Sequence, residues 1–525
     1  MNNDCANSWR RLHAVRIHAV HIHAVRIREV RVLAGLVIAF GFVLRLLYAW
    51  HVELIPEEAY YWNYSRHLDI GYLDHPPMVA WLIKGGTSLF GETEFGVRFG
   101  ALCCGVLAAV FIFRLTFDLF GESAALVAVA LAQVLPFFFL SGLLMTPDAP
   151  LTAAWAASLY FLQRALVQGR SQAWLWGGLT LGLGSISKYT IGLVVIATLC
   201  FMLMDRPARR WFRRWEPYVA LLIAAAVFSP VVIWNVEHDW ASFLFQTARR
   251  LADPPRFALH ELIGSAVVLL TPTGLFAAVA AMVTMGQRGR GLEYLQVALW
   301  VPLTVFIVFS LRHEVKLDWT GAPWTAAVPL MALGFIEAGG SERRWLRLAW
   351  PPTIAIMLLF YGVGWCYLAF GIPGVGYTQH TELVPLGWRQ FGRQVEDIAN
   401  AARSTYGPRL LVVGMDRYAI ASELAFYAHD RVAAVAGTSS AHLFDDVGLM
   451  YEQWFPVALQ SGRPLLLVAW HPEDIAPRQL EGRALGLEPV QEGLLSRNGS
   501  VVRRYYYRIA QRYEYPSTAS AGRGR

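Results

Sequence analysis

Long apolar segments recur through the first 370 residues of this 525-residue chain, separated by shorter polar stretches. They cover residues 32–51, 97–117, 123–140, 149–167, 173–187, 189–204, 217–234, 261–284, 295–311, 320–337 and 348–370. Several are shorter than the roughly 20 apolar residues of a typical transmembrane helix, but most approach that length. The pattern predicts an α-helical polytopic membrane protein with about 11 transmembrane helices.

The pattern changes after residue 370. Residues 409–415 and 464–470 have the short apolar runs of buried strands, and 418–429 between them is typical of a helix. The Arg- and Tyr-rich stretch 503–515 is expected to add one strand. These elements predict a small C-terminal α/β domain.

The chain is therefore expected to have four parts. They are a basic low-complexity tail (1–31), a transmembrane domain (32–370), the α/β domain (371–515) and a disordered tail (516–525). The first apolar segment lacks a small-residue cleavage site, so it is expected to remain as an uncleaved anchor.

Composition supports a location in lipid. The chain is 56% hydrophobic and only 16% charged, whereas soluble domains carry about 25% charged residues. Its formal charge of +7 comes from separate clusters rather than one basic face, which disfavours a nucleic-acid partner. The clusters lie at 26–31, 206–214, 288–290 and 343–347.

Placing all four basic clusters in the cytoplasm satisfies the positive-inside rule with one topology. The N-terminus is then cytoplasmic and the C-terminal domain extracytoplasmic, in a multi-pass protein of the cytoplasmic (inner) membrane. The outer loops are 52–96, 141–148, 187–189, 235–260 and 312–319. Only three of the 45 basic residues are lysines, and Lys84, Lys188 and Lys316 all fall in these loops. Lysine near a phosphate acts as a compact point charge, although chance can also produce this distribution.

The first outer loop holds the densest group of polar and aromatic residues. Pro56 places Glu57 and Glu58 in the first turn of a helix, where acids are common for structural reasons and also serve as catalytic groups. An aromatic cluster follows at 60–64, suited either to stacking on sugars or to the membrane interface. Asp74 and His75 then precede two prolines that rigidly orient the loop.

Five motifs together resemble the GT-C membrane glycosyltransferases, which include protein O-mannosyltransferases and bacterial transferases that add aminoarabinose or uronic acids to lipid A. The motifs are PEEAYYWNYSRHLDIGYLDHPPMVAWLI (56–83), TPDAPLTAAWAASLYFLQRAL (146–166), GLGSISKYTIGL (182–193), SPVVIWNVEHDWASFLFQ (229–246) and DRYAIASELAFYA (416–428). None of them specifies the sugar.

The resemblance implies transfer of a sugar from a polyprenyl-phosphate carrier to a lipid, glycan or protein acceptor at the outer face of the membrane. The family usually has Asp-Glu in the first loop, with the aspartate catalytic. The matching residues here are Glu57 and Glu58, and this departure leaves open which of them acts. The chemistry of sugar transfer requires the same kinds of residue, since the acceptor hydroxyl needs a base and the departing phosphate needs cationic stabilisation.

Lys188 is the preferred phosphate ligand, since the family motif places it at the outer end of a short helix; the alternative is a lysine that only reaches the interface. His75 is expected to assist the base or bind substrate, or to be a structural histidine, and Asp148 either binds substrate or caps its helix. The remaining expected substrate-binding residues are Tyr61, Asp74, Tyr189, Arg249, Arg250 and Lys316.

No cofactor is expected, and no cysteine pair has metal-ligand spacing, although a divalent metal stays an open alternative. A second class of function is a transporter or flippase for a lipid or solute, and broken helices are typical of such proteins. The chain shows no internal repeat between its halves, and its polar groups concentrate in the outer loops rather than mid-membrane. These features favour the transferase.

Overall fold

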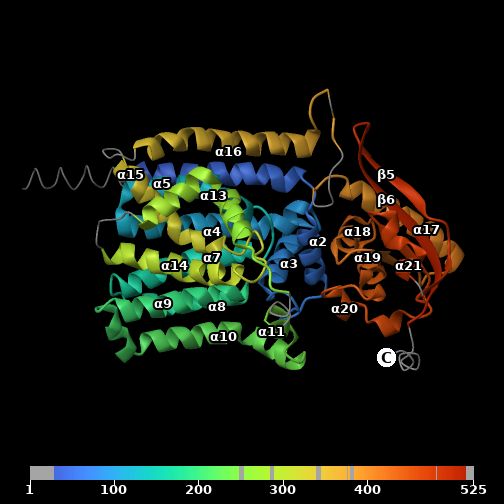
Figure 1. Cartoon of the computed structure of the whole chain (residues 1–525), viewed down its shortest axis with the longest axis horizontal. Helices are drawn as coiled ribbons and strands as arrows, with labels where there is room; N and C mark the ends of the chain where they lie inside the picture. Colours follow the sequence, from blue (N-terminus) through green and yellow to red (C-terminus); the bar gives the residue numbers. More distant parts are fainter. Residues whose placement is uncertain are drawn as a thin grey trace, which may run out of the picture.

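The computed structural model describes residues 29–515, apart from 248–253, 284–288, 339–343, 375, 379–383 and 481. A bundle of roughly parallel helices forms one part of the molecule, and the C-terminal domain lies at one end of that bundle (Figure 1). The predicted basic tail is described only from Glu29 onward, and the predicted tail 516–525 lies outside the described residues.

Each apolar segment expected from the sequence coincides with a helix or with two consecutive helices. In chain order these are Glu29–His51, α4 (Glu94–Phe120), α5 (Glu122–Val134), α6 (Pro136–Ser141), α7 (Asp148–Leu166), α8 (Ala173–Ser185), η1 (Tyr189–Ile191), α9 (Gly192–Met204), α10 (Glu216–Glu237), α13 (Leu259–Val283), α14 (Arg290–Ser310), η3 (Ala322–Ala326), α15 (Ala327–Glu337) and α16 (Arg344–Phe370). The connecting segments contain α2 (Pro56–Arg66), α3 (Met78–Phe90), η2 (Ala208–Arg213) and α11 (Ala241–Gln246).

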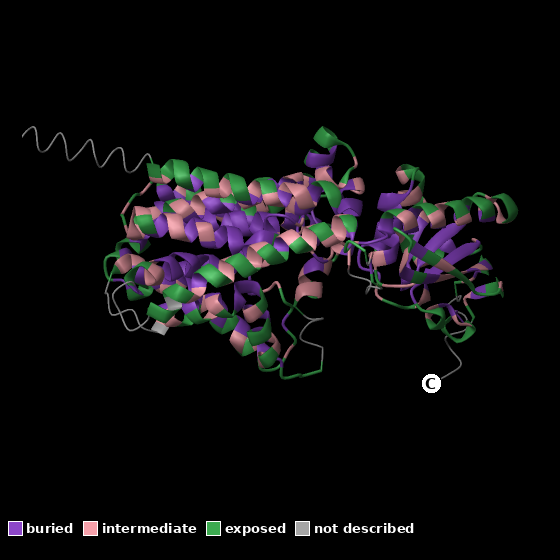
Figure 2. Cartoon of the chain, turned by 90° about the horizontal axis from the view of Figure 1, so that it is seen from above, coloured by how far each residue is buried: buried purple, intermediate pink, exposed green. Residues whose placement is uncertain are grey.

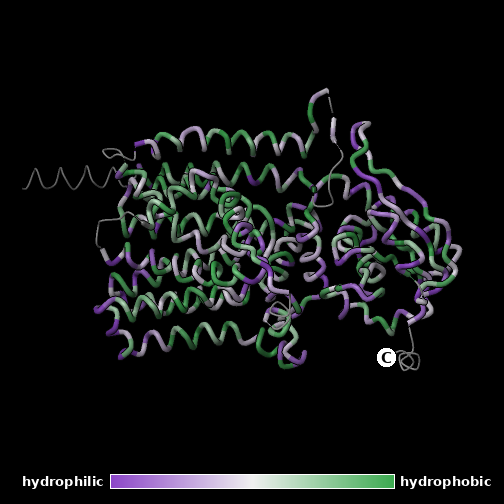
Figure 3. Tube along the Cα trace, viewed as in Figure 1, coloured by the Kyte–Doolittle hydropathy of each residue, from purple (hydrophilic) through white to green (hydrophobic). Residues whose placement is uncertain are grey.

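The bundle has the surface of a membrane protein. Within the described residues, six helices are long and apolar enough to cross a membrane, and four shorter apolar helices lie among them. The outer helices α10 and α16 expose large apolar side chains such as Leu222 (67%) and Leu359 (66%). Figure 2 shows exposed residues on the outside of the bundle around a buried interior, and Figure 3 shows hydrophobic residues along the helices of the bundle. Such surfaces are stable in lipid. The expected class, an α-helical polytopic membrane protein, is therefore confirmed, while the number of membrane-spanning helices stays a prediction.

Two glycines allow α8 and α10 to approach closely. A Cβ on Gly178 would lie 2.3 Å from the backbone oxygen of Ala220, and one on Gly182 would lie 2.7 Å from the Cβ of Val227. The spacing of four residues places both glycines on one face of α8. Small residues at this spacing let helix backbones pack together in lipid, where van der Waals contact drives association.

The first loop begins with α2, which starts at Pro56 as the sequence predicts. The Glu58 carboxylate caps this start by accepting a hydrogen bond from the backbone nitrogen of Ile55 (3.2 Å), which is one half of a capping box. The helix lies between the bundle and the C-terminal domain (Figure 1). Its rings Tyr60, Trp62 and Tyr64 are at most 2% exposed, so they form core and take no part in a sugar-binding surface.

The C-terminal domain contains a six-stranded mixed sheet with helices packed against it. Strand β1 (Leu411–Gly414) pairs in parallel with β2 (Thr438–Ser440) and β3 (Leu465–Ala469), and β3 pairs antiparallel with the long β6 (Ser500–Tyr513). Strands β4 (Ala484–Leu487) and β5 (Gln491–Arg497) also pair with β6. The helices are α17 (Trp388–Tyr406), α18 (Ala419–Tyr427), α19 (Arg431–Gly437), α20 (Tyr451–Trp454) and α21 (Pro477–Leu480).

The strands expected at 409–415, 464–470 and 503–515, and the helix expected at 418–429, are all observed within a few residues. The sequence did not predict α17 or strands β2, β4 and β5. The three strands are short or half exposed, and therefore lack the apolar run that identifies a buried strand. The domain boundaries remain predictions.

Candidate functional site

The two neighbouring carboxylates of α2 have different surroundings. Glu58 is fully buried, and its carboxylate binds the Arg98 guanidinium of α4 at 2.6 Å and accepts a hydrogen bond from the backbone nitrogen of Met145 at 3.0 Å. Arg98 also donates to the backbone oxygens of Val52 and Glu53. Glu58 therefore joins the first loop to the bundle, with its oxygens already occupied.

Glu57, in contrast, is only half buried, and its carboxylate accepts a hydrogen bond from the Tyr418 hydroxyl at 3.4 Å. Burial raises the pKa of Glu57 above its usual value, and the neighbouring charge of Glu58 raises it further. The hydrogen bond from Tyr418 and the charge of Lys316 act in the opposite direction. A partly accessible carboxylate with a raised pKa has the properties of a general base.

Lys188 lies at the turn between α8 and η1, with its ammonium between two carboxylates. It donates to both oxygens of Asp148 at 2.9 and 3.0 Å, and to Asp318 at 2.6 Å. Burial lowers the pKa of Lys188, but the two carboxylates outweigh burial and raise it above the usual value. The ammonium is therefore charged and already paired with acidic partners.

Asp318 is absent from the residues that the sequence singled out. It lies in the outer loop 312–319, two positions after Lys316, and nothing local distinguishes it from Glu314 in the same polar loop. Its position two residues after Lys316, which the sequence did single out, was the signal that could have identified it as a site residue. The ion pair with Lys188 spans 130 residues of sequence, so only the folded chain reveals it.

Three interactions bring the predicted residues into one region. The loop after α14 carries Asp318 to Lys188, while Lys316 lies close enough to Glu57 to lower the pKa of that carboxyl. The first loop also docks on the turn before Lys188, because the backbone nitrogen of Met78 donates to the Ile186 carbonyl at 2.9 Å. The loop after α14 and the first loop thus connect Glu57 with the Lys188 ion pairs, and these residues form the charged cluster.

Asp74 is a buried structural centre of the first loop. Its carboxylate accepts hydrogen bonds from the hydroxyls of Tyr60 (3.1 Å) and Tyr64. Burial raises the pKa of Asp74, and the two hydroxyls counteract that effect. Its backbone oxygen accepts a hydrogen bond from the Gln246 side chain, which ties α11 to the loop. These contacts occupy the Asp74 carboxylate, and its expected role in binding substrate stays a prediction.

The other predicted residues vary in accessibility. Tyr61 is 7% exposed, and its ring meets the half-buried ring of His75 edge-on at 5.7 Å. Tyr189 is half buried and shares a 2.8 Å hydrogen bond with Ser242, while Lys316 is exposed. Arg249 and Arg250 lie outside the described residues. Within the part of the chain that the structure describes, no three His, Cys, Asp or Glu side chains are grouped as a metal site requires.

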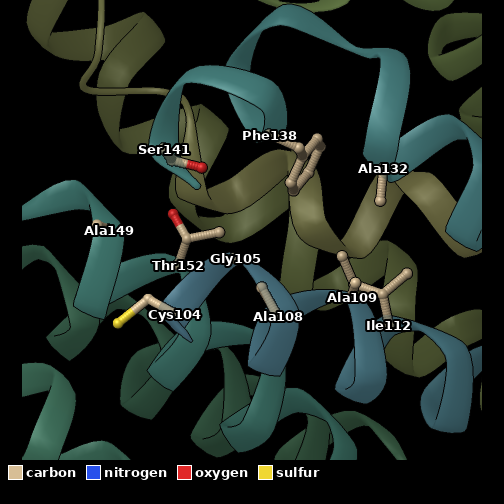
Figure 4. A pocket seen from close by; sticks show the side chains of 10 residues that line it. All are labelled: Cys104, Gly105, Ala108, Ala109, Ile112, Ala132, Phe138, Ser141, Ala149 and Thr152. Atoms are coloured by element: carbon tan, nitrogen blue, oxygen red, sulfur yellow. The ribbon is translucent and has the colours of Figure 1, made fainter. Parts of the chain in front are cut away.

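A small cavity lies within the helix bundle, between α4 and α7 and close to Ala132, Phe138 and Ser141 (Figure 4). Its lining contains no charged group, and its few polar atoms include the Thr152 hydroxyl, which donates to the Asp148 carbonyl at 2.7 Å. The cavity belongs to the packing of the bundle rather than to the charged cluster.

The chain is similar to known membrane transferases. Residues 74–234 match the family model described as dolichyl-phosphate-mannose-protein mannosyltransferase. The lipid A galacturonosyltransferase RgtD of Rhizobium johnstonii is 26% identical over 464 residues, covering 83% of this chain and 90% of that protein. An undecaprenyl phosphate-alpha-4-amino-4-deoxy-L-arabinose arabinosyl transferase of Pseudomonas aeruginosa is 27% identical over 305 residues, covering 52% of this chain and 54% of that protein.

Among solved structures, ArnT from Cupriavidus metallidurans has a TM-score of 0.60 to this chain at 15% sequence identity. The match covers 90% of this chain and 97% of ArnT, which has been solved in the apo state and bound to undecaprenyl phosphate. At this identity the likeness shows a common fold.

Proposed function

Because this chain belongs to the GT-C membrane glycosyltransferases that use a polyprenyl-phosphate-linked sugar, we propose that its acceptor is lipid A or another part of lipopolysaccharide. The similarity to RgtD over most of both chains supports this acceptor class. The observation that carries the chemistry is the half-buried Glu57 carboxylate within reach of the charge of Lys316 and beside the Lys188 cluster. The donor sugar is a uronic acid or an aminopentose, as in the relatives' names.

In the proposed reaction, Glu57 accepts the proton of an acceptor hydroxyl as that oxygen attacks the anomeric carbon of the donor. The bond from the anomeric carbon to the carrier phosphate breaks, and the phosphate leaves with the electron pair. Lys316 is exposed and near Glu57, so it can approach the phosphate as negative charge develops. Lys188 supplies a second positive charge only if the phosphate competes with Asp318 for its ammonium.

The geometry of α7 supports placing this site at the outer face of the inner membrane. The helix starts at Asp148 in the cluster and has 19 residues, about 28 Å at 1.5 Å per residue, close to the thickness of the hydrocarbon core. At its other end, the Leu166 carbonyl accepts a hydrogen bond from Arg290, which also binds Asp205. Arg290 belongs to a basic cluster, so the positive-inside rule favours a site on the opposite side, outside the cytoplasm.

With all eleven predicted segments crossing the membrane, reporter fusions at Arg210 and Asn400 are expected to indicate opposite compartments. Arg210 follows the end of α9 that the proposed topology assigns to the cytoplasm, and Asn400 lies in α17 of the C-terminal domain. A reporter active only in the cytoplasm should work at Arg210, and one active only outside should work at Asn400. The same compartment for both fusions would rule out this topology.

Purified protein in vesicles should transfer sugar from an undecaprenyl-phospho-sugar to lipid A, detected by the mass of the product. Donors carrying galacturonic acid and aminoarabinose would be compared, with a vesicle-uptake assay of the same lipids run in parallel. Uptake or flipping without a covalent product would instead support the transporter alternative. Transfer to a peptide or another glycan, but not to lipid A, would contradict the proposed acceptor.

Lys188→Ala is expected to lower kcat/KM for the donor at least about tenfold, equivalent to about 1.4 kcal/mol of transition-state stabilisation. Lys188→Arg should restore only part of this, since a planar guanidinium differs in reach from an ammonium. Lys84→Ala is the matched control, a lysine of α3 in the first outer loop. If Lys188→Ala lowers only the melting temperature, the lysine holds Asp148 and Asp318 in place and does not act on the donor.

A further inference from the structure

The segment between β1 and α18 is held in a defined conformation. The Asp416 carboxylate accepts hydrogen bonds from the backbone nitrogen of Ile420 at 3.1 and 3.2 Å, and its backbone oxygen accepts one from Ala441 at 3.1 Å. Tyr418, two residues further along, directly precedes α18. This segment begins the motif DRYAIASELAFYA, to which the sequence assigned no role.

Helix α18 packs against α2, the helix that carries Glu57, and contacts fix it at both ends. At its C-terminal end, the Tyr427 hydroxyl accepts a hydrogen bond from the backbone nitrogen of Leu54 at 2.7 Å and donates to Glu94 at 3.2 Å. At the other end, the Tyr418 ring lies 4.6 Å from the ring of Tyr60, at an interplanar angle of 33°. The position of Tyr418 relative to α2 is therefore determined by packing on both sides.

We propose that Tyr418 is a positioning residue of the active site, through which the C-terminal domain holds the Glu57 carboxylate ready to accept the acceptor's proton. The proposal rests on the proposed function, in which Glu57 is the base. The Tyr418 hydroxyl donates a hydrogen bond to Glu57 Oε1 at 3.4 Å, across 361 residues of sequence. This long distance is common for catalytic groups before substrate is bound, and the bond tightens in the reacting complex.

Tyr418 serves as a hydrogen-bond donor and not as the base. Burial raises the pKa of its phenol above the usual value, and the negative charge of Glu57 adds to that effect, so the hydroxyl keeps its proton. A hydrogen bond donated to a carboxylate favours the ionised form and lowers its pKa. The hydroxyl thus counteracts the burial that raises the pKa of Glu57.

Other ionisable groups also face Glu57 from the surrounding elements. Glu58 and Tyr61 lie on α2 itself, Glu423 lies on α18, and Lys316 lies in the loop after α14. None of these changes in Tyr418→Phe, which removes one oxygen and keeps the ring that packs on Tyr60. The substitution therefore isolates the hydrogen bond.

Tyr418→Phe is expected to move the acidic limb of the pH–rate profile upward by about half a pH unit, because the lost hydrogen bond had favoured the ionised carboxylate. On that limb Glu57 is mostly protonated, so a shift of about half a pH unit lowers the ionised fraction, and with it the rate, about threefold. The rate should recover at higher pH, and donor KM should change little, because the hydroxyl contacts the base and not the donor.

Tyr406→Phe is the matched control. It removes a tyrosine–glutamate hydrogen bond that lies wholly within the C-terminal domain, between Tyr406 at the end of α17 and Glu488. Its pH profile should match that of the wild type. A normal profile for Tyr418→Phe would overturn the proposal, as would equal shifts in both variants. If the wild-type protein transfers no sugar, the proposed function itself fails, so the two failures are distinguishable.

Discussion

Glu57→Gln is expected to abolish sugar transfer, with a fall in kcat of about 100-fold or more, while leaving the fold intact. Glutamine keeps the shape of the side chain and can still accept the hydrogen bond from Tyr418, but it cannot take a proton. General bases contribute about 100- to 10,000-fold to rate, which sets the expected size. The measurement is initial rate with a saturating polyprenyl-phospho-sugar donor, beside the melting temperature in detergent.

Glu92→Gln is the control for this substitution. Glu92 is also in the first loop and pairs with Arg66 at 3.0 Å, but both side chains are about a quarter exposed. It should transfer sugar at nearly the wild-type rate. Near-normal turnover in Glu57→Gln would remove this carboxylate from the mechanism, since the residue would then be dispensable for proton transfer.

Arg98→Met is expected to destabilise the protein by about 3–5 kcal/mol, because it leaves the carboxylate of Glu58 buried without its counter-ion. The backbone oxygens of Val52 and Glu53 would lose hydrogen-bond donors as well. Thermal unfolding in detergent would measure the effect, with donor binding as a test of whether the first loop remains in place.

Arg66→Met provides the comparison, since it removes the partly exposed partner of Glu92. Exposed ion pairs contribute about 0–1 kcal/mol, so its melting temperature should change little. The double variant Arg98→Met with Glu58→Gln should recover part of the lost stability, because it also removes the buried charge. An Arg98→Met protein as stable as the wild type would contradict the structural role of this pair.

The choice between Glu57 and Glu58 shows where prediction from the sequence ended. Both follow Pro56 in one helical turn, so their local patterns are equivalent. Their environments differ because Arg98, 40 residues away from Glu58, reaches one carboxylate and not the other. Such a distinction depends on the packing of α4 against the first loop, which adjacent residues do not encode.

The aromatic cluster gives a second example. The sequence left its rings open to sugar stacking or to the membrane interface, and the structure buries Tyr60 and Tyr64 around Asp74 and against the C-terminal domain. An aromatic residue in a loop carries no local signal of its partner. The partner here is a domain that begins about 300 residues later in the chain.

The sequence by itself determined the helical membrane class, the start of α2 and the main strands of the C-terminal sheet. These features depend on local periodicity, because each apolar helix or strand must bury its own side chains in lipid or core. Only the tertiary structure decided the pairing of Glu58 with Arg98, the Lys188 contact with Asp318, and the approach of Tyr418 to Glu57. Each of these joins residues at least 40 positions apart, and a charge or hydroxyl acquires its role from the partner that folding brings to it.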